Sequence, residues 1–119
     1  MTERVIRGAF AVASELGHGF LETVYKKALV EELRAENIPV IVEKPYQILY
    51  RGVVIGRYIA DIVVEDAVLV ELKAISALSN PHIMQVRNYL KASRLRVGLL
   101  LNFGTPSVEI RRVLVERRT

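Results

Sequence analysis

Apolar and polar residues follow two different periods along this chain, one typical of helices and one typical of strands. Apolar side chains recur every three or four residues over about residues 3–16 and 21–36, which predicts two amphipathic helices. A third helix is predicted over about residues 81–93, with Asn80 as its N-cap and Pro81 in the first helical position.

Runs rich in β-branched residues predict five strands, over residues 40–50, 53–64, 68–72, 96–102 and 108–115. The fourth run is apolar throughout and is expected inside the sheet, whereas the last carries arginines and is expected at an edge. The resulting order, α-α-β-β-β-α-β-β, is typical of an α/β fold with a mixed central sheet flanked by helices. No repeat or linker interrupts it, so residues 1–119 are interpreted as one domain.

The second and third predicted strands form a hairpin, because only residues 65–67 separate them. If Val64 pairs with Val68, counting back places Asp61 opposite Glu71, with Cβ atoms roughly 4.5–5.5 Å apart. Lys73 then shares their face, since alternate residues of a strand point the same way. The opposite face is expected to be apolar and to carry Ala60, Ile62, Val64, Val68, Val70 and Leu72.

Two carboxylates side by side in apolar surroundings repel each other. One of Asp61 and Glu71 must therefore take up a proton, or both must find a cation. A hard divalent cation is the usual partner of clustered carboxylate oxygens. The alternative is a structural cluster of ion pairs at the end of the sheet.

Composition excludes several other kinds of site. The chain has no cysteine, so it has no disulfide, thiolate zinc site or thiol nucleophile. Glu22 occupies the third glycine position of a G-x-G-x-x-G motif, and no P-loop occurs, so nucleotide cofactors are not indicated. Glu22 itself has two interpretations, as an acid favoured by the helix dipole or as a third carboxylate directed at the site.

Hydropathy bears on location and assembly. Apolar residues make up 51% of the chain, yet no apolar run approaches the roughly 20 residues of a membrane span, and no signal peptide is recognised. No membrane association and a cytoplasmic location are therefore expected. The apolar surplus and the edge strand at 108–115 predict a homodimer.

Positive charge is concentrated near the C-terminus. The net charge is +4, and residues 86–119 hold eight Lys or Arg residues against two Asp or Glu residues. This asymmetry predicts a polyanionic partner, although an ordinary solvated surface is the alternative. Part of one set of arginines is expected to contact the phosphate backbone of a nucleic acid. The set is Arg94, Arg96, Arg111, Arg112, Arg117 and Arg118.

Several short motifs occur together in this chain. Gly19, Glu22 and Tyr25 form a G-x-x-E-x-x-Y pattern, and the sequence there resembles the GxxExxY protein family. The resemblance extends from about residue 4 to residue 115 through Ala60-Asp61, Val70-Glu71-Leu72-Lys73, Pro81-His82-x-x-Gln85, Asn88-Tyr89-Leu90-Lys91 and Gly98-Leu-Leu-Leu-Asn102-Phe103. That family resembles a branch of the PD-(D/E)-x-K nuclease superfamily, although Ala60 stands where that motif has proline. The resemblance implies a restriction-endonuclease-like core and phosphodiester hydrolysis that depends on a divalent metal.

The resemblance also implies roles for individual residues. Asp61, Glu71 and the backbone carbonyl of Leu72 would bind the metal, Mg²⁺ or alternatively Mn²⁺, and Glu22 would join them. Lys73 would position or activate the attacking water. Gln85 and Tyr89 are similar to the Q-x-x-x-Y helix motif of RecB-like nucleases, in which Gln85 supports catalysis and Tyr89 contacts nucleic acid.

Three functions follow as hypotheses. The first is a metal-dependent nuclease, with DNA favoured over RNA as its substrate. The second is a nuclease-like module that binds nucleic acid or supports an assembly with little or no turnover. The third is a structural α/β domain, against which the combined set of Glu22, Asp61, Glu71, Lys73 and Gln85 argues.

Overall fold

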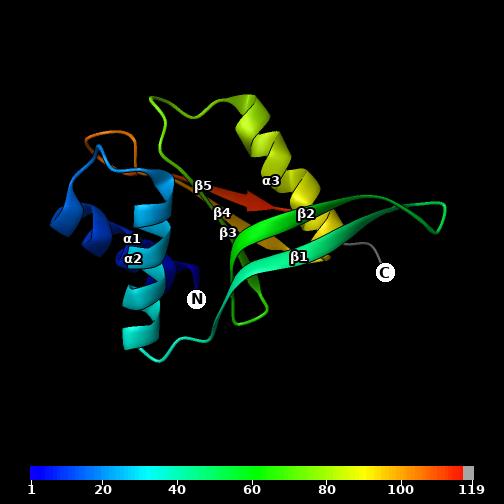
Figure 1. Ribbon diagram of the computed structural model, residues 1–119, viewed down its shortest axis with the longest axis horizontal. Coiled ribbons are helices and arrows are strands. Elements are labelled where there is room, and N and C mark those ends of the chain that lie inside the picture. The colour runs from blue at the N-terminus through cyan, green and yellow to red at the C-terminus, as the bar shows by residue number, and fades with distance from the viewer. Residues whose placement is uncertain (117–119) are drawn as a thin grey trace.

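A five-stranded sheet with helices on both faces organises the computed structural model, which describes residues 1–116 (Figure 1). The strands lie in the order β1-β2-β3-β4-β5. Only β3 and β4 pair in parallel, and α3 connects them. The predicted elements and their order are confirmed, with the bounds α1 (Thr2–Leu16), α2 (Glu22–Ala35), β1 (Val40–Tyr50), β2 (Val53–Val64), β3 (Val68–Lys73), α3 (Asn80–Ser93), β4 (Val97–Asn102) and β5 (Glu109–Leu114).

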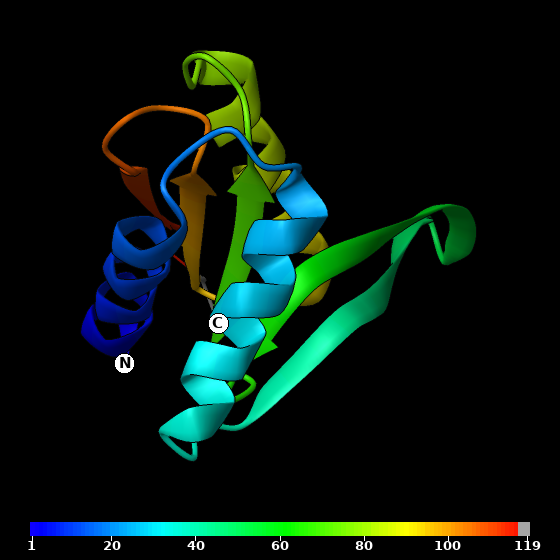
Figure 2. The same cartoon turned by 60° about the vertical axis from the view of Figure 1, so that its left-hand side comes forward.

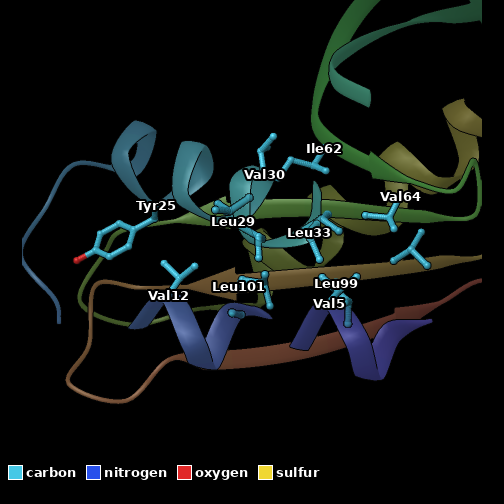
Figure 3. Packing of buried hydrophobic residues seen from close by; sticks show 14 of the residues in the cluster. Val5, Val12, Tyr25, Leu29, Val30, Leu33, Ile62, Val64, Leu99 and Leu101 are labelled. Atoms are coloured by element: carbon cyan, nitrogen blue, oxygen red, sulfur yellow. The ribbon is translucent and has the colours of Figure 1, made fainter. Parts of the chain in front are cut away.

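Helices α1 and α2 cover one face of the sheet and form the larger hydrophobic core with it (Figure 3). Leu29 and Leu33 of α2 are fully buried there, together with Leu99 and Leu101 of β4. The buried stripe of α2 begins at Tyr25. Leu21 and Val24, which the helical period also placed in that stripe, are exposed in and just before the first turn.

Helix α3 covers the opposite face with a second, smaller core. Its buried residues Val86 and Leu90 pack against Leu69 of β3 and Leu100 of β4. Strands β3 and β4 are thus covered on both sides, which accounts for their nearly continuous apolar sequences. Helix α3 begins one residue earlier than predicted: Ser79 is its N-cap, and its backbone N–H donates to Nδ1 of His82.

Strands β1 and β2 extend beyond the sheet as a two-stranded arm (Figure 2). Only residues 62–64 of β2 pair with β3, while the pairing of β1 with β2 extends from Val40–Val64 to Tyr50–Val53 with local interruptions. Large apolar side chains remain exposed on this arm, including Leu49, Tyr50, Val53 and Ile55. Within residues 1–116, no helix is both long and apolar enough to cross a membrane.

The arm twists where Glu43 faces Asp61. The neighbouring pairs Val42–Ile62 and Lys44–Ala60 are in register, but Glu43 has a φ of 54° and forms no ladder pair with Asp61. Ile62 consequently packs in the α1/α2 core, whereas Ala60 packs in the α3 core. The expectation that Ala60 shares a face with Ile62 is therefore wrong, because simple alternation does not continue through the twist.

Candidate metal and nucleic-acid site

Asp61 and Glu71 lie at the fork where β2 leaves β3. The predicted pairing of Val64 with Val68 is confirmed, but the β2–β3 ladder ends at Ile62 and Val70, one pair before the acids. Side chains replace the missing ladder bonds: the Asp61 N–H donates to Glu71 Oε2 at 2.9 Å, and the Leu72 N–H donates to Asp61 Oδ2 at 2.9 Å. The two acids are close neighbours, as the hairpin predicted, although through these bonds and not through the backbone ladder.

This reciprocal bonding orients oxygen atoms toward the fork. Each carboxylate has one oxygen held by a backbone amide, which leaves its other oxygen for a further partner. In a strand the N–H and C=O groups of one residue point to the same edge, so the Leu72 carbonyl faces the same side as its amide. Asp61, Glu71 and Leu72 therefore place oxygen atoms on the same side of the fork.

The Glu71 carboxyl group is buried, with 7% of its surface exposed. Burial, followed by repulsion from Asp61, raises the pKa of Glu71 to about 8, although the hydrogen bond from the Asp61 amide and the charge of Lys73 act in the opposite direction. Without a nearby cation Glu71 therefore retains a proton at neutral pH. A bound cation would favour the ionised form.

We expect the metal-free protein to lose stability as the pH rises from about 4.5 toward 8. Across that window the unfolded chain has released the Glu71 proton while the folded protein still holds it, so rising pH favours unfolding. Glu71→Gln keeps an oxygen for the Asp61 amide but cannot ionise. It should flatten this slope and stabilise the protein by at most about 5 kcal/mol above pH 8.

Urea denaturation in EDTA between pH 5 and pH 9 measures this effect. The matched control is Glu65→Gln, which removes an exposed carboxylate from the hairpin loop. Equal slopes for the wild-type protein and Glu71→Gln would show that Glu71 is not the titrating group.

Lys73 and Gln85 meet beside the acids. Lys73 Nζ donates to Gln85 Oε1 at 3.4 Å, which links the end of β3 to α3. The chain after Lys73 is held by the buried amide of Asn102, whose Oδ1 accepts from the Ile75 N–H and whose Nδ2 donates to the Ile75 carbonyl, both at 3.0 Å. Asn102 lies in the predicted motif of the fourth strand, but sequence analysis gave it no role.

Glu22 approaches the fork from the first turn of α2. Most of its surface is exposed, but partial burial of the carboxyl group, followed by the charge of Asp61, raises the pKa of Glu22. The two carboxylates are therefore within electrostatic reach of each other. Within residues 1–116, however, no three Asp, Glu, His or Cys side chains are already gathered closely enough to hold a metal ion. Glu22 would have to move its side chain to join Asp61 and Glu71.

The G-x-x-E-x-x-Y residues support the position of Glu22. The Tyr25 hydroxyl donates to the Gly17 carbonyl at 2.7 Å and accepts from the Phe20 N–H at 3.2 Å, which fixes the loop before α2. Gly19 lies in that loop with a φ of 117°, a conformation that favours glycine. Tyr25 is itself buried (Figure 3), so its role here is to hold the loop that precedes Glu22.

Lys26 is a site residue that sequence analysis missed. Its Nζ lies 3.9 Å from Asp61 Oδ1 and 3.6 Å from Glu43 Oε1, and its side chain is only 16% exposed. The available signal was its spacing, because a residue four positions after Glu22 lies on the same side of a helix. Lys26 thus supplies positive charge to the Asp61 oxygen that the Leu72 amide does not hold.

We expect Lys26→Met to strengthen binding of a divalent cation. The substitution keeps most of the side-chain packing but removes a charge that competes for Asp61 Oδ1. A partly exposed ion pair of this kind corresponds to about a fivefold change in affinity. Calorimetric titration with Ca²⁺ measures the change, with Lys27→Met, an exposed neighbour, as the control. Weaker binding by Lys26→Met would instead make Lys26 a supporting part of the metal site.

The remaining candidate contacts with nucleic acid lie on α3, just before β4, and on β5. Tyr89 stacks on Tyr58 with ring centroids 3.8 Å apart, and Arg94 is the C-cap of α3. Arg111 lies in one row with Glu71, two strands away, because both pair with Leu100.

The arginines of β5 do not form one surface. Arg112 donates to Thr2 Oγ1 at 3.0 Å on the α1 side, whereas the neighbouring Arg111 points to the other face of the strand. Arg96 is exposed just before β4. Arg117 and Arg118, also proposed from the sequence, lie outside the described residues.

A solved structure described as "Crystal structure of SSO0001" is similar to this chain, with a TM-score of 0.60 and 17% sequence identity. The similarity covers 81% of this chain and 50% of that one, so the chain spans half the length of that protein. At this identity the likeness concerns the fold alone. A search of curated proteins finds no match.

Sequence comparison with protein families is more specific. The model of the PD-(D/E)XK nuclease superfamily matches residues 1–113, a range that contains every element of the fold except the last residue of β5. The matched range includes both acids at the fork, Lys73 and the α3 residues beside them. The chain belongs to the PD-(D/E)XK nuclease superfamily.

Proposed function

We propose that this chain hydrolyses phosphodiester bonds of nucleic acid with divalent metal ions bound at the fork between β2 and β3. The observation that carries the proposal is the reciprocal bonding that holds the Asp61 and Glu71 carboxylates side by side. Membership of the superfamily supports it, because PD-(D/E)XK nucleases generally use divalent metals.

The residues at the fork fit a hard cation. Asp61, Glu71 and the Leu72 carbonyl offer oxygen atoms only, and Glu22 adds a further carboxylate within electrostatic reach. Mg²⁺ prefers oxygen ligands and binds through one or two carboxylates while keeping several waters. We therefore propose Mg²⁺, with Mn²⁺ as a substitute. The raised pKa of Glu71 supports a cation here, because a cation bound beside Glu71 would offset the burial and the repulsion from Asp61 that now favour the protonated form.

The bound metal would act as a Lewis acid toward the phosphate and would promote formation of the attacking hydroxide. Lys73 adds a positive charge beside the site, and its bond to Gln85 limits the positions that the ammonium group can take. Gln85 therefore positions Lys73, and Tyr89 contacts the nucleic acid. We assign the chain to the GxxExxY branch of the superfamily on the arrangement of Gly19, Glu22 and Tyr25.

One observation favours a second function, a nuclease-like module that binds nucleic acid with little or no turnover. Lys26 already lies 3.9 Å from Asp61 Oδ1, so its positive charge offsets part of the charge of Asp61 without a metal ion. Within the described residues, the carboxylates are also not gathered as a complete metal site. Such a module would bind nucleic acid without needing a divalent ion.

Two measurements test these functions. Calorimetric titration with Mg²⁺ and Ca²⁺ should show saturable binding, which the module hypothesis does not require. Labelled single- and double-stranded DNA and RNA, incubated with Mg²⁺ or Mn²⁺, should then be cleaved, with DNA the preferred substrate. Binding of metal and nucleic acid without cleavage under any of these conditions would contradict the nuclease function and favour the module.

The homodimer and the cytoplasmic location remain proposals. Exposed apolar side chains on the arm and Leu114 on the edge strand β5 support self-association. Sedimentation at micromolar concentration measures the assembly, and a monomer there would refute the dimer.

A further inference from the structure

A groove of about 820 Å³ lies between the arm and the outer side of α3. The arm contributes Gln47, Ile48 and Leu49 of β1 as one wall. Helix α3 and its C-cap contribute the other wall, and the side chains used below are Met84, Gln85, Asn88, Tyr89, Lys91 and Arg94. Strands β1 and β2 leave the sheet and run alongside α3 (Figures 1 and 2), which places the β1 residues that line the groove opposite the helix.

The groove is positively charged. Among residues 1–116, Lys91 and Arg94 are its only charged lining residues, both are exposed, and no acid lines it. Gln47, Gln85 and Asn88 add amide groups that can hydrogen-bond phosphates or bases. A polyanionic ligand is therefore complementary to this surface, whereas an acidic fork alone would repel it.

The lining also offers apolar and aromatic surface. Leu49 is 59% exposed and Met84 is 49% exposed, and both face the groove. Tyr89 belongs to a continuous stack with Tyr58 and Tyr46, with centroid distances of 3.8 Å and 5.4 Å. Because Tyr58 covers one face of the Tyr89 ring, the surface of Tyr89 that lines the groove is held rigidly. A positive groove with a rigid aromatic ring is typical of sites that bind single strands.

The groove leads directly to the proposed catalytic fork. Gln85 lines it and also accepts the hydrogen bond from Lys73. A strand that follows the groove toward Gln85 therefore arrives beside Lys73 and Glu71. The size of the groove limits what can enter, because 820 Å³ is in the range of sites for small ligands and accommodates only a few nucleotides.

We propose that this groove binds an unpaired segment of nucleic acid, with its phosphates near Lys91 and Arg94 and a base packed against Tyr89. The inference rests on the proposed nuclease function and specifies its substrate as single-stranded DNA or RNA, or a single-stranded end of a duplex. Of the arginines named from the sequence, the inference uses Arg94. It leaves out Arg111 and Arg112, whose side chains lie on opposite faces of β5.

Binding of labelled nucleic acid, measured without metal so that no cleavage occurs, tests whether the groove holds single strands. Fluorescence anisotropy in EDTA would compare labelled oligothymidylate, oligouridylate and a blunt-ended duplex of two separate strands over a range of salt concentrations. Single strands should bind about tenfold more tightly than the duplex, which corresponds to the stacking of about one base. The DNA and RNA oligomers then distinguish the two sources of single strands.

Two double variants that remove the same charge test which basic side chains contact the nucleic acid strand. The groove variant is Lys91→Ala with Arg94→Asn, because Arg94 has a φ of 66° and asparagine tolerates that conformation. It should weaken binding and flatten the plot of log K against log salt by about 1.4, the value for two phosphate contacts on a single strand. The control, Arg111→Ala with Arg112→Ala, removes the same charge and should leave the slope unchanged.

Two kinds of result would contradict the groove proposal. Equal binding of duplex and single strands, or a flattened slope in the control and not in the groove variant, would overturn the groove proposal. If the groove variant unfolds early, Lys91→Ala alone replaces it, with an expected change of about 0.7. Because no metal is present, a groove that binds as predicted while Mg²⁺ supports no cleavage would overturn only the nuclease function. Cleavage of duplex without groove binding would overturn only this inference.

Discussion

Replacing Asp61 with Asn is expected to abolish metal-dependent cleavage while leaving nucleic-acid binding intact or tighter. Asparagine keeps an oxygen that can accept from the Leu72 N–H, so the fork should keep its shape. It removes one of the two charges that would hold the cation and lessens the repulsion felt by a polyphosphate chain. Activity should fall by more than the roughly 10–100-fold that loss of a group supporting a metal ligand costs.

Initial rates with Mg²⁺ and anisotropy in EDTA measure the two effects of Asp61→Asn separately. The matched control is Asp66→Asn, which makes the same chemical change in the loop of the same hairpin. Asp66 is exposed and contacts Lys44 at 3.4 Å, away from the fork. Cleavage that survives Asp61→Asn, or falls equally in both variants, would remove Asp61 from the metal site.

Replacing Gly104 with Ala is expected to be among the most destabilising single changes in the chain. A Cβ atom at Gly104 would lie 2.2 Å from the Ile75 carbonyl oxygen and 2.3 Å from the Ile75 nitrogen. Both are backbone atoms, so no side chain can rotate away, and the segment that follows Lys73 must shift. Overpacking of this kind costs about 3 kcal/mol or more when the surroundings cannot relax.

Urea denaturation measures this loss, with Gly56→Ala as the control. A Cβ atom at Gly56 meets only side-chain atoms of Ile48, at 3.6 Å and 3.8 Å, so this change should be mild. Gly104→Ala should also reduce cleavage, since Asn102 bonds both Ile75 and the Gly104 N–H and so couples this turn to Lys73. Equal stability of the two variants would show that the turn can move at little cost.

Much of the fold was encoded locally and could be predicted from the sequence. The period of apolar residues depends only on the geometry of one helix or strand, so it identified all eight elements in order. The three-residue loop after Val64 set the register of the hairpin for the same reason. The nearness of Asp61 and Glu71 followed from that register, because both lie within a few residues of one turn.

Other features depended on how distant elements pack, and no local pattern encodes that. The twist at Glu43 arises where the arm leaves a sheet that α2 and α3 cover from opposite sides, so Ala60 and Ile62 point to different cores. The same packing brings Lys26 to Asp61 and places the arm over α3.

Local sequence patterns therefore predicted which side chains are candidates for the chemistry and which of them are neighbours in the hairpin. The tertiary structure alone decided what surrounds them: the burial that raises the pKa of Glu71, the lysine that competes for Asp61, and the groove that leads to Lys73. Burial, charge pairing and cavities are properties of several elements in contact, and their energies depend on distances that only the folded chain fixes.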